Sequence, residues 1–172
     1  SEISYDGYRP SSFLEVQGAK EVGIEFHSLS KTYNMTGWRV GFACGNARLV
    51  AALAKVKSNL DSGIFSAIQH AGLRALTGPQ EHIKNMCQLY QERRDVLVDG
   101  LNEIGWKTEK PKATFYVWTK IPAKYSALTA LEFATLLVDE IGVAVARGTG
   151  FGDDGDGVVG FALVADAARI TM

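Results

Sequence analysis

The chain has 172 residues, which is about the size of one domain and long enough to bury a core. Hydrophobic residues make up 47% and charged residues 22%, the balance of an ordinary soluble globular protein, and the net charge of −1 argues against a nucleic acid or an anionic membrane as partner. No apolar run approaches the roughly 20 residues of a membrane-spanning helix.

The cysteines and the chain ends suggest the compartment and the extent of the protein. Cys44 and Cys87 are too few for the disulfide framework of a small secreted domain, so we predict reduced, buried thiols and a cytoplasmic protein. No helix cap or strand opens the sequence, and a helix capped by Asp166 reaches Met172 after barely one turn. We therefore expect a fragment of a longer protein.

Strand-like and helical patterns alternate in the first part of the chain. Short apolar runs predict strands, and apolar residues at helical spacing predict helices. The predicted elements are a strand at Val22–His27, a loop at Ser28–Thr36, a strand at Trp38–Cys44, a helix capped by Asn46 that runs to Lys57, and a helix at Ile64–Leu76. This alternation is typical of a parallel α/β layer.

The pattern changes near Gly78, where Gly78-Pro79 stops the preceding helix. A long helix then follows, and we interpret its charged turn, Gln91–Asp95, as a solvated face or a helix–helix contact. The predicted elements are a helix at Gln80–Ile104, a strand at Thr114–Thr119, a helix from the capping box Thr129–Glu132 to Glu140, and strands at Val143–Ala146 and Val158–Val164. This order suits a separate α+β domain.

The stretch from Ser28 to Gly41 carries the clearest chemical signal, reading Ser-Leu-Ser-Lys-Thr-Tyr-Asn-Met-Thr-Gly-Trp-Arg-Val-Gly. The amine of Lys31 can form a Schiff base with an aldehyde, and no carboxylate neighbours it in the sequence. The planar fork of Arg39 suits a phosphate, and the hydroxyls of Ser28 and Ser30 can donate to phosphate oxygens. We expect Gly37 to let the backbone turn tightly between the lysine and the arginine.

Each of these residues has an ordinary structural interpretation when taken alone. An isolated Lys31 would be a solvated loop lysine, either serine a turn or capping residue, and Arg39 a surface ion-pair partner. Their joint spacing favours a site for pyridoxal phosphate (PLP), which carries both an aldehyde and a phosphate.

This stretch resembles the lysine signature of the class I/II (fold type I) aminotransferases at every defining position. Further similarity covers essentially the whole chain and is strongest to the branch that contains LL-diaminopimelate aminotransferase. The matching segments are Tyr5–Tyr8, Gly45-Asn46, Lys57–Asn59, Thr77–Gln80, Tyr90–Asp95 and Ala113–Trp118.

The resemblance implies a PLP enzyme that transfers an amino group from an amino acid to a 2-keto acid, working as a homodimer. It makes Lys31 the catalytic, Schiff-base lysine and Ser28, Ser30 and Arg39 the phosphate ligands. The fold class it implies is α/β, the C-terminal part of a fold type I PLP-dependent transferase. Residues 1–78 would complete the large PLP-binding domain, and residues 79–172 would form the small C-terminal domain, truncated in its last helix.

Two departures from the family pattern affect the rest of the site. The family's tyrosine and aspartate that contact the cofactor ring, and its glycine-rich phosphate loop, would lie before Ser1. The family usually reads Gly-Tyr-Val-Arg before an apolar strand, and that arginine binds the substrate carboxylate, but Gly160 occupies its position here. Arg147 and Arg169 are possible replacements, and the carboxylate site remains unassigned.

Several other motifs are interpreted as structural. The GxGxxG pattern at Gly150–Gly155 contains two aspartates that would repel a pyrophosphate and precedes a strand, so we reject a dinucleotide site. The aspartates at 153, 154 and 156 lack the ligand count of a calcium loop and suggest a solvated turn. No histidine has metal-ligand spacing with a cysteine, so no metal is expected.

Three functional hypotheses remain open. The first is a PLP-dependent aminotransferase. The second is another PLP enzyme, such as a C–S lyase that carries out β-elimination, because the cofactor supplies the same electron sink to both reactions. The third is a folded, dimerising module that does not hold the cofactor.

Overall fold

The computed structural model describes residues 2–170 and divides the chain into two compact units, Ser1–Asn85 and Met86–Met172. The boundary falls within helix α4 (Glu81–Glu103), close to the change of pattern near Gly78. The assignment of residues 1–78 and 79–172 to a large and a small domain remains a prediction.

Two strands form the sheet of the first unit. β1 (Ile24–Ser28) pairs with β2 (Gly41–Gly45) in an antiparallel register that runs from Ile24 opposite Gly45 to Ser28 opposite Gly41. The parallel layer expected from the sequence is therefore wrong for this pair. The reason is the connection: parallel neighbours need a long crossover, whereas residues 29–40 contain only the short 3-10 turn η2 (Thr36–Trp38).

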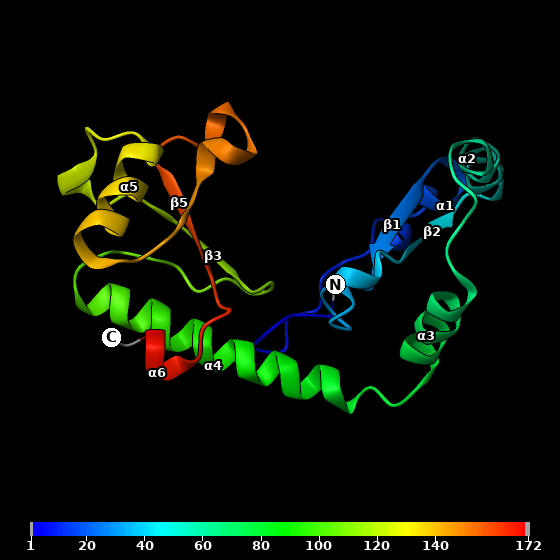
Figure 1. Ribbon diagram of the computed structural model, residues 1–172, viewed down its shortest axis with the longest axis horizontal. Helices are drawn as coiled ribbons and strands as arrows, with labels where there is room; N and C mark the ends of the chain where they lie inside the picture. The colour runs from blue at the N-terminus through cyan, green and yellow to red at the C-terminus, as the bar shows by residue number, and fades with distance from the viewer. Residues whose placement is uncertain (1, 171–172) are drawn as a thin grey trace. The chain divides into compact units, whose positions relative to one another are not determined.

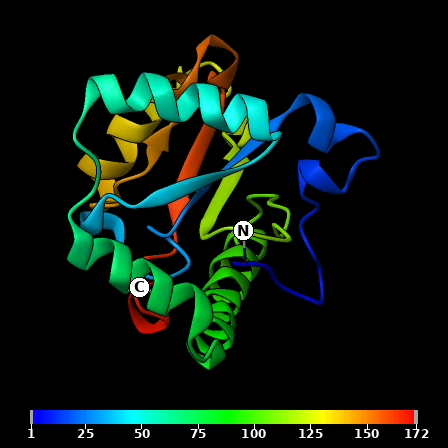
Figure 2. The ribbon, with the colours of Figure 1, turned by 90° about the vertical axis from the view of Figure 1, so that its right-hand side faces the viewer.

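The helices of this unit follow the predicted order. Helix α2 (Ala47–Leu60) begins after Asn46, whose Oδ1 accepts hydrogen bonds from the backbone of Arg48 and Leu49 at 3.0 and 3.1 Å. Helix α3 (Ser66–Thr77) ends at Gly78, and an irregular segment separates it from α2 (Figure 2). The short elements η1 (Phe13–Glu15) and α1 (Ala19–Val22) precede β1, so Val22 ends a helical turn instead of starting the strand.

The second unit has the predicted α+β order. An antiparallel sheet in the order β3-β5-β4 follows helix α4, and helix α5 lies between β3 and β4 in the sequence (Figure 1). The bounds are β3 Tyr116–Lys120, η3 Ala123–Tyr125, α5 Ala130–Ile141, β4 Ala146–Arg147, η4 Gly148–Phe151, η5 Asp153–Gly155, β5 Val158–Ala162 and α6 Ala167–Ile170. The strand predicted at Val143–Ala146 is wrong in extent, because Val143 still donates its backbone N–H to Leu137 in the C-terminal cap of α5.

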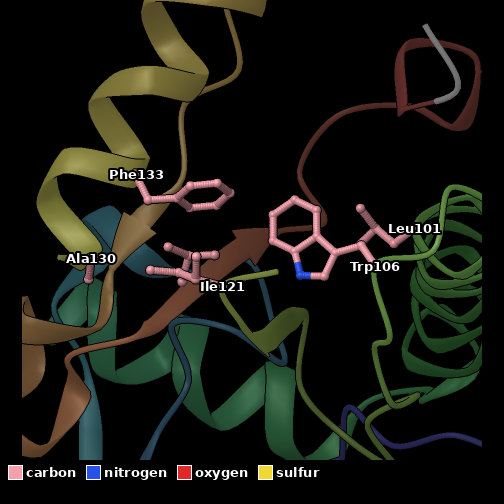
Figure 3. Packing of buried hydrophobic residues seen from close by; sticks show 6 residues of the cluster. Leu101, Trp106, Ile121, Ala130 and Phe133 are labelled. Atoms are coloured by element: carbon pink, nitrogen blue, oxygen red, sulfur yellow. The ribbon is translucent and has the colours of Figure 1, made fainter. Parts of the chain in front are cut away.

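An aromatic core holds the second unit together (Figure 3). The rings of Trp106 and of Phe133 in α5 pack edge to face, with their centroids 5.5 Å apart. The Trp106 Nε1 donates a hydrogen bond to the Lys120 carbonyl at 2.7 Å. The indole therefore packs without leaving its polar atom unsatisfied. The buried members of the cluster are Leu101, Trp106, Ile121, Ala130, Phe133 and Val159.

Both ends of α5 are capped by specific contacts. The predicted capping box is present, with Thr129 and Glu132 exchanging hydrogen bonds, and Gly142 ends the helix in the left-handed region at φ 68°. Asp156 also accepts a hydrogen bond from the backbone N–H of Ala130 at 2.8 Å. Asp156 is exposed, in agreement with the interpretation of the aspartate cluster as a solvated turn, and it also helps to cap a helix distant in sequence.

The remaining structural predictions agree with the structure in some respects and differ from it in others. The Gly150–Gly155 loop forms 3-10 turns and leads into β5, so it lacks the helix of a dinucleotide site. Cys44 and Cys87 are free thiols, as predicted, but both are only partly buried, so the predicted burial is wrong. Among residues 2–170, no helix combines the length and apolar character needed to cross a bilayer.

Candidate active site

The lysine lies on a single helical turn at the end of β1. Ser28 is the last residue of the strand, and the backbone N–H of Leu29 still bonds to Val40 at 3.2 Å. The chain then coils, with the N–H of Tyr33 bonding to the Leu29 carbonyl at 3.2 Å. This turn presents Lys31 as an exposed residue between the buried Ser30 and Thr32.

The two serines occupy different environments. Ser30 is buried, whereas Ser28 is exposed, and the Ser28 hydroxyl accepts a hydrogen bond from the Ser30 backbone N–H at 3.1 Å. A serine hydroxyl that accepts one bond still has its own proton to donate. The local structure therefore fixes Ser28 without using up its donor.

The arginine is held by a contact within the same loop. Arg39 follows η2 in the left-handed region at φ 52°, and its Nη1 donates to the Thr36 carbonyl at 2.8 Å. The Thr36 hydroxyl in turn donates to the Ser30 carbonyl at 2.9 Å. Three segments of the loop are thus linked, because Thr36 bonds to both Ser30 and Arg39.

The tight turn has a different origin from the one expected. Gly37 does not adopt a positive φ, and a Cβ atom added there would meet no atom within 4 Å. Asn34 and Arg39 take the left-handed conformation instead, at φ 53° and 52°. The conformational freedom of glycine is therefore not what turns the chain at position 37.

The donor set fits the phosphate and aldehyde of PLP. Arg39 is exposed, and apart from the bond to Thr36 its guanidinium N–H groups have no acceptor among residues 2–170. Ser28 supplies a neutral donor on the same loop, and Lys31 supplies an exposed amine. A guanidinium with hydroxyls is a suitable set for a phosphate monoester. Among the described residues, no group of three or more His, Cys, Asp or Glu side chains is placed to hold a metal ion.

The four predicted site residues do not line the pocket found beside them. A cavity of about 690 Å³ lies against β2 and against helices α2 and α3. Its wall includes Leu29, Val40 and Phe42, but not Lys31, Ser28, Ser30 or Arg39. In the lysine loop, residues 29–40, Leu29 and Val40 therefore face this cavity, whereas Lys31 and Arg39 are exposed outside it.

Gly160, where the family pattern has an arginine, lies beneath an aromatic ring. It pairs with Trp118 of β3 on one side and Ala146 of β4 on the other, and a Cβ added to it would lie 3.2 Å from the Trp118 indole. Arg147 pairs with Val159, so it lies on the opposite face of the sheet. This register argues against Arg147 as a replacement on the Gly160 face.

Sequence reasoning missed two residues that the structure connects to these positions. Thr36 received no role from the sequence, and only the folded loop reveals its bonds to Ser30 and Arg39. Trp118 lies far from Gly160 in sequence and meets it through strand pairing. The hydroxyl at position 36 was a visible signal, but its partners were not.

Comparison with known proteins supports the family resemblance of the lysine motif. Residues 5–170 match the family model for aminotransferase class I and II. The chain is 52% identical to LL-diaminopimelate aminotransferase from Desulforudis audaxviator and 54% identical to the protein of that name from Moorella thermoacetica, over 170 residues in each case. These alignments cover 99% of this chain and 43% of each relative, so the chain spans less than half the length of the relatives it matches.

Solved structures give the same fold. Substrate-bound BacF from Bacillus subtilis is 37% identical with a TM-score of 0.90, covering 98% of this chain and 43% of that one. A probable N-succinyldiaminopimelate aminotransferase from Thermus thermophilus is 36% identical with a TM-score of 0.90, and the match covers 99% of this chain and 45% of that one. Aminotransferases of class I and II, including LL-diaminopimelate aminotransferase, are PLP-dependent. The fold class expected from the sequence is confirmed as part of the fold of these solved structures. The chain belongs to the class I and II aminotransferase family.

Proposed function

We propose that this chain provides the lysine and phosphate-binding half of a PLP-dependent aminotransferase site. The observation that carries the proposal is the hydrogen-bonded loop from Ser28 to Arg39. Along this loop the exposed Lys31 follows the Ser28 hydroxyl and precedes the Arg39 guanidinium, which is hydrogen-bonded to Thr36. The family membership of the chain supports the same activity. The proposed reaction transfers an amino group from an amino acid to a 2-keto acid.

The roles of the residues follow from their chemistry. Arg39 would bind two phosphate oxygens through its fork, and Ser28 and Ser30 would add neutral hydrogen bonds. The Nζ of Lys31 can condense with an aldehyde, releasing water, and when unprotonated can carry a proton between neighbouring atoms of the substrate. PLP supplies the electron sink for this chemistry when it is bound.

The wider assignment extends these roles to the whole protein. We infer that residues 1–78 belong to the large PLP-binding domain and residues 79–172 to the small C-terminal domain. We also infer a homodimer acting on amino acid and 2-keto acid substrates, as the family resemblance implies. The names of the relatives favour a diaminopimelate-type amino acid as substrate.

The first experiment tests whether Lys31 takes up the cofactor. The 172-residue chain would be incubated with stoichiometric PLP, reduced with borohydride and digested for mass spectrometry. We expect a covalent adduct on the Lys31 peptide, lost in K31R and retained in K55R, which changes an exposed lysine of helix α2. Absence of an adduct on Lys31, or equal labelling of both lysines, would contradict the proposal.

A second candidate is favoured by the surroundings of Gly160. Trp118 covers that position, and no cation replaces the arginine of the family pattern on either paired residue of the same face. A chain that holds the cofactor without transferring an amino group fits this observation. Addition of an amino acid to the loaded chain would distinguish the two: release of the 2-keto acid supports the aminotransferase, and a stable adduct without release supports the second candidate.

A further inference from the structure

Thr36 is the residue that connects the two sides of the lysine loop. Its hydroxyl Oγ1 donates to the Ser30 carbonyl at 2.9 Å, and its own carbonyl accepts from Arg39 Nη1 at 2.8 Å. One residue thus contacts both predicted phosphate ligands that lie beyond β1. We propose that Thr36 is a positioning residue for phosphate binding, an inference that rests on the proposed function.

The hydroxyl bond acts on the peptide group next to the lysine. The carbonyl of Ser30 belongs to the peptide bond that joins Ser30 to Lys31, so a donor on that oxygen restricts rotation of this peptide plane. The backbone N–H of Ser30 is held independently by the Ser28 hydroxyl at 3.1 Å. Both backbone polar groups of Ser30, a predicted phosphate ligand, are therefore held, one by Ser28 and the other by Thr36.

The carbonyl bond acts on the arginine. Arg39 has the left-handed backbone conformation, which is uncommon for a residue other than glycine and requires support from its surroundings. The bond from Nη1 to Thr36 supplies such support three residues away and restricts the long side chain before any ligand arrives. A restricted guanidinium loses less rotamer freedom on binding an anion than a mobile one.

The contact leaves the binding capacity of the arginine largely intact. A guanidinium has five N–H donors, and the Thr36 carbonyl accepts from one nitrogen. Nε and Nη2 remain as a fork for two oxygens of a phosphate monoester. Thr36 thus orients Arg39 without competing for its bidentate face.

Two substitutions separate the hydroxyl from the rest of the side chain. T36V keeps the shape but removes the donor to Ser30, whereas T36S keeps the donor. T32V provides a matched control, because the Thr32 hydroxyl lies in the same loop but donates to Glu2. Thermal unfolding would establish that each variant remains folded.

The measurement compares PLP with pyridoxal, which has the aldehyde but no phosphate. The Kd of each would be determined from the absorbance of its complex with the 172-residue chain. We expect T36V to weaken PLP binding by about tenfold, the effect of one hydrogen bond, and to leave pyridoxal binding within about twofold. T36S and T32V should retain the PLP-to-pyridoxal affinity ratio of the unsubstituted chain.

The outcomes distinguish this inference from the proposed function. Equal weakening of both ligands in T36V, or no weakening of either, would overturn the positioning role while leaving the proposed function intact. Failure of the unsubstituted chain to form a complex with either aldehyde would count against the proposed function. In that case, titration with inorganic phosphate, followed by NMR at the Ser30 and Arg39 amides, still tests Thr36: equal shifts with and without T36V would overturn the inference.

Discussion

Arg94 illustrates how much one residue can depend on its tertiary surroundings. It lies in the charged turn of α4 but is only 2% exposed. Its Nη1 donates to the Pro111 carbonyl at 3.0 Å, and its Nη2 lies 2.7 Å from Asp95 Oδ1. The interpretation of Gln91–Asp95 as a solvated face is therefore wrong for Arg94. The alternative of a helix–helix contact remains a prediction, because the partner Pro111 lies outside any helix.

We expect R94A to lower the free energy of unfolding by about 2–4 kcal/mol, because it removes a buried ion pair and leaves the Pro111 carbonyl without this donor. This expected loss of stability is toward the lower end of the range for a buried ion pair, because Asp95 is partly exposed and its Oδ1 still has Lys110 Nζ at 3.2 Å. Urea unfolding measures the change. E92A, at an exposed neighbour in α4, should change stability by less than about 0.5 kcal/mol. Equal effects of both substitutions would contradict the assigned role.

The predicted site also depends on single residues. Residue type, spacing and the family resemblance together selected Lys31, Ser28, Ser30 and Arg39, and their ligand roles remain predictions. The structure adds the bonds that connect them, and it moves the tight turn from Gly37 to Asn34 and Arg39. The sequence could not supply those bonds, because they depend on the dihedral angles of the folded loop.

At the scale of elements, α5 shows how local sequence can define a helix. The carboxylate of Glu132 accepts from the backbone N–H of Thr129 at 2.8 Å, and the Thr129 hydroxyl accepts from the Glu132 N–H. The Thr129 backbone N–H, followed by the Thr129 hydroxyl, which also donates to the carboxylate at 2.8 Å, lowers the pKa of Glu132 below its ordinary value of 4.5. The capping box was predicted because all its interactions fall within four consecutive residues.

This lowered pKa gives a pH-dependent prediction. A carboxyl group with a lower pKa in the folded state stabilises the protein above its unfolded-state pKa, and that contribution disappears as the pH falls through the folded-state value. We expect E132Q to lower the Tm at pH 7 and the deficit to shrink as the pH falls below 4.5. Thermal unfolding between pH 7 and a pH below 4.5 measures this deficit in Tm. E140Q, near the other end of α5, is the control. A deficit that does not change with pH would exclude the carboxylate as its source.

Strand pairing was harder to predict than the helices. The runs that became β1, β2, β3 and β5 were all recognised, but the antiparallel pairing of β1 with β2 was not. Apolar runs indicate that a strand is buried without indicating its neighbours. The order β3-β5-β4 likewise pairs β3 with β5, although η3, α5, β4, η4 and η5 lie between them in the sequence.

At the scale of the whole molecule, the two units differ in how their sheets are completed. β5 pairs on both sides, with β3 and β4, whereas β1 and β2 pair only with each other among the described residues. The second unit also contains the aromatic core around Trp106. A two-stranded sheet alone is marginally stable in water, so the first unit is expected to open more readily.

Hydrogen exchange of the 172-residue chain tests this difference. We expect the amides of β5 to exchange at least about tenfold more slowly than those of β1 and β2, because local opening of a doubly paired strand costs more free energy. Mass spectrometry of peptides that cover Val158–Ala162 and Ile24–Ser28 measures both rates. Slower exchange in β1 would show that the two-stranded sheet is stabilised by contacts other than strand pairing.

The sequence by itself determined the family, the positions of the longer helices α2, α3, α4 and α5, and the identity of the lysine motif. These features depend on residue types at close spacing, which the chain carries in any conformation. The tertiary structure alone decided the antiparallel pairing of β1 with β2, the burial of Arg94, the ring of Trp118 over Gly160 and the bonds from Thr36 to both ends of the lysine loop. Such contacts join atoms whose separation is set by backbone dihedral angles and strand register, so spacing along the chain does not specify them.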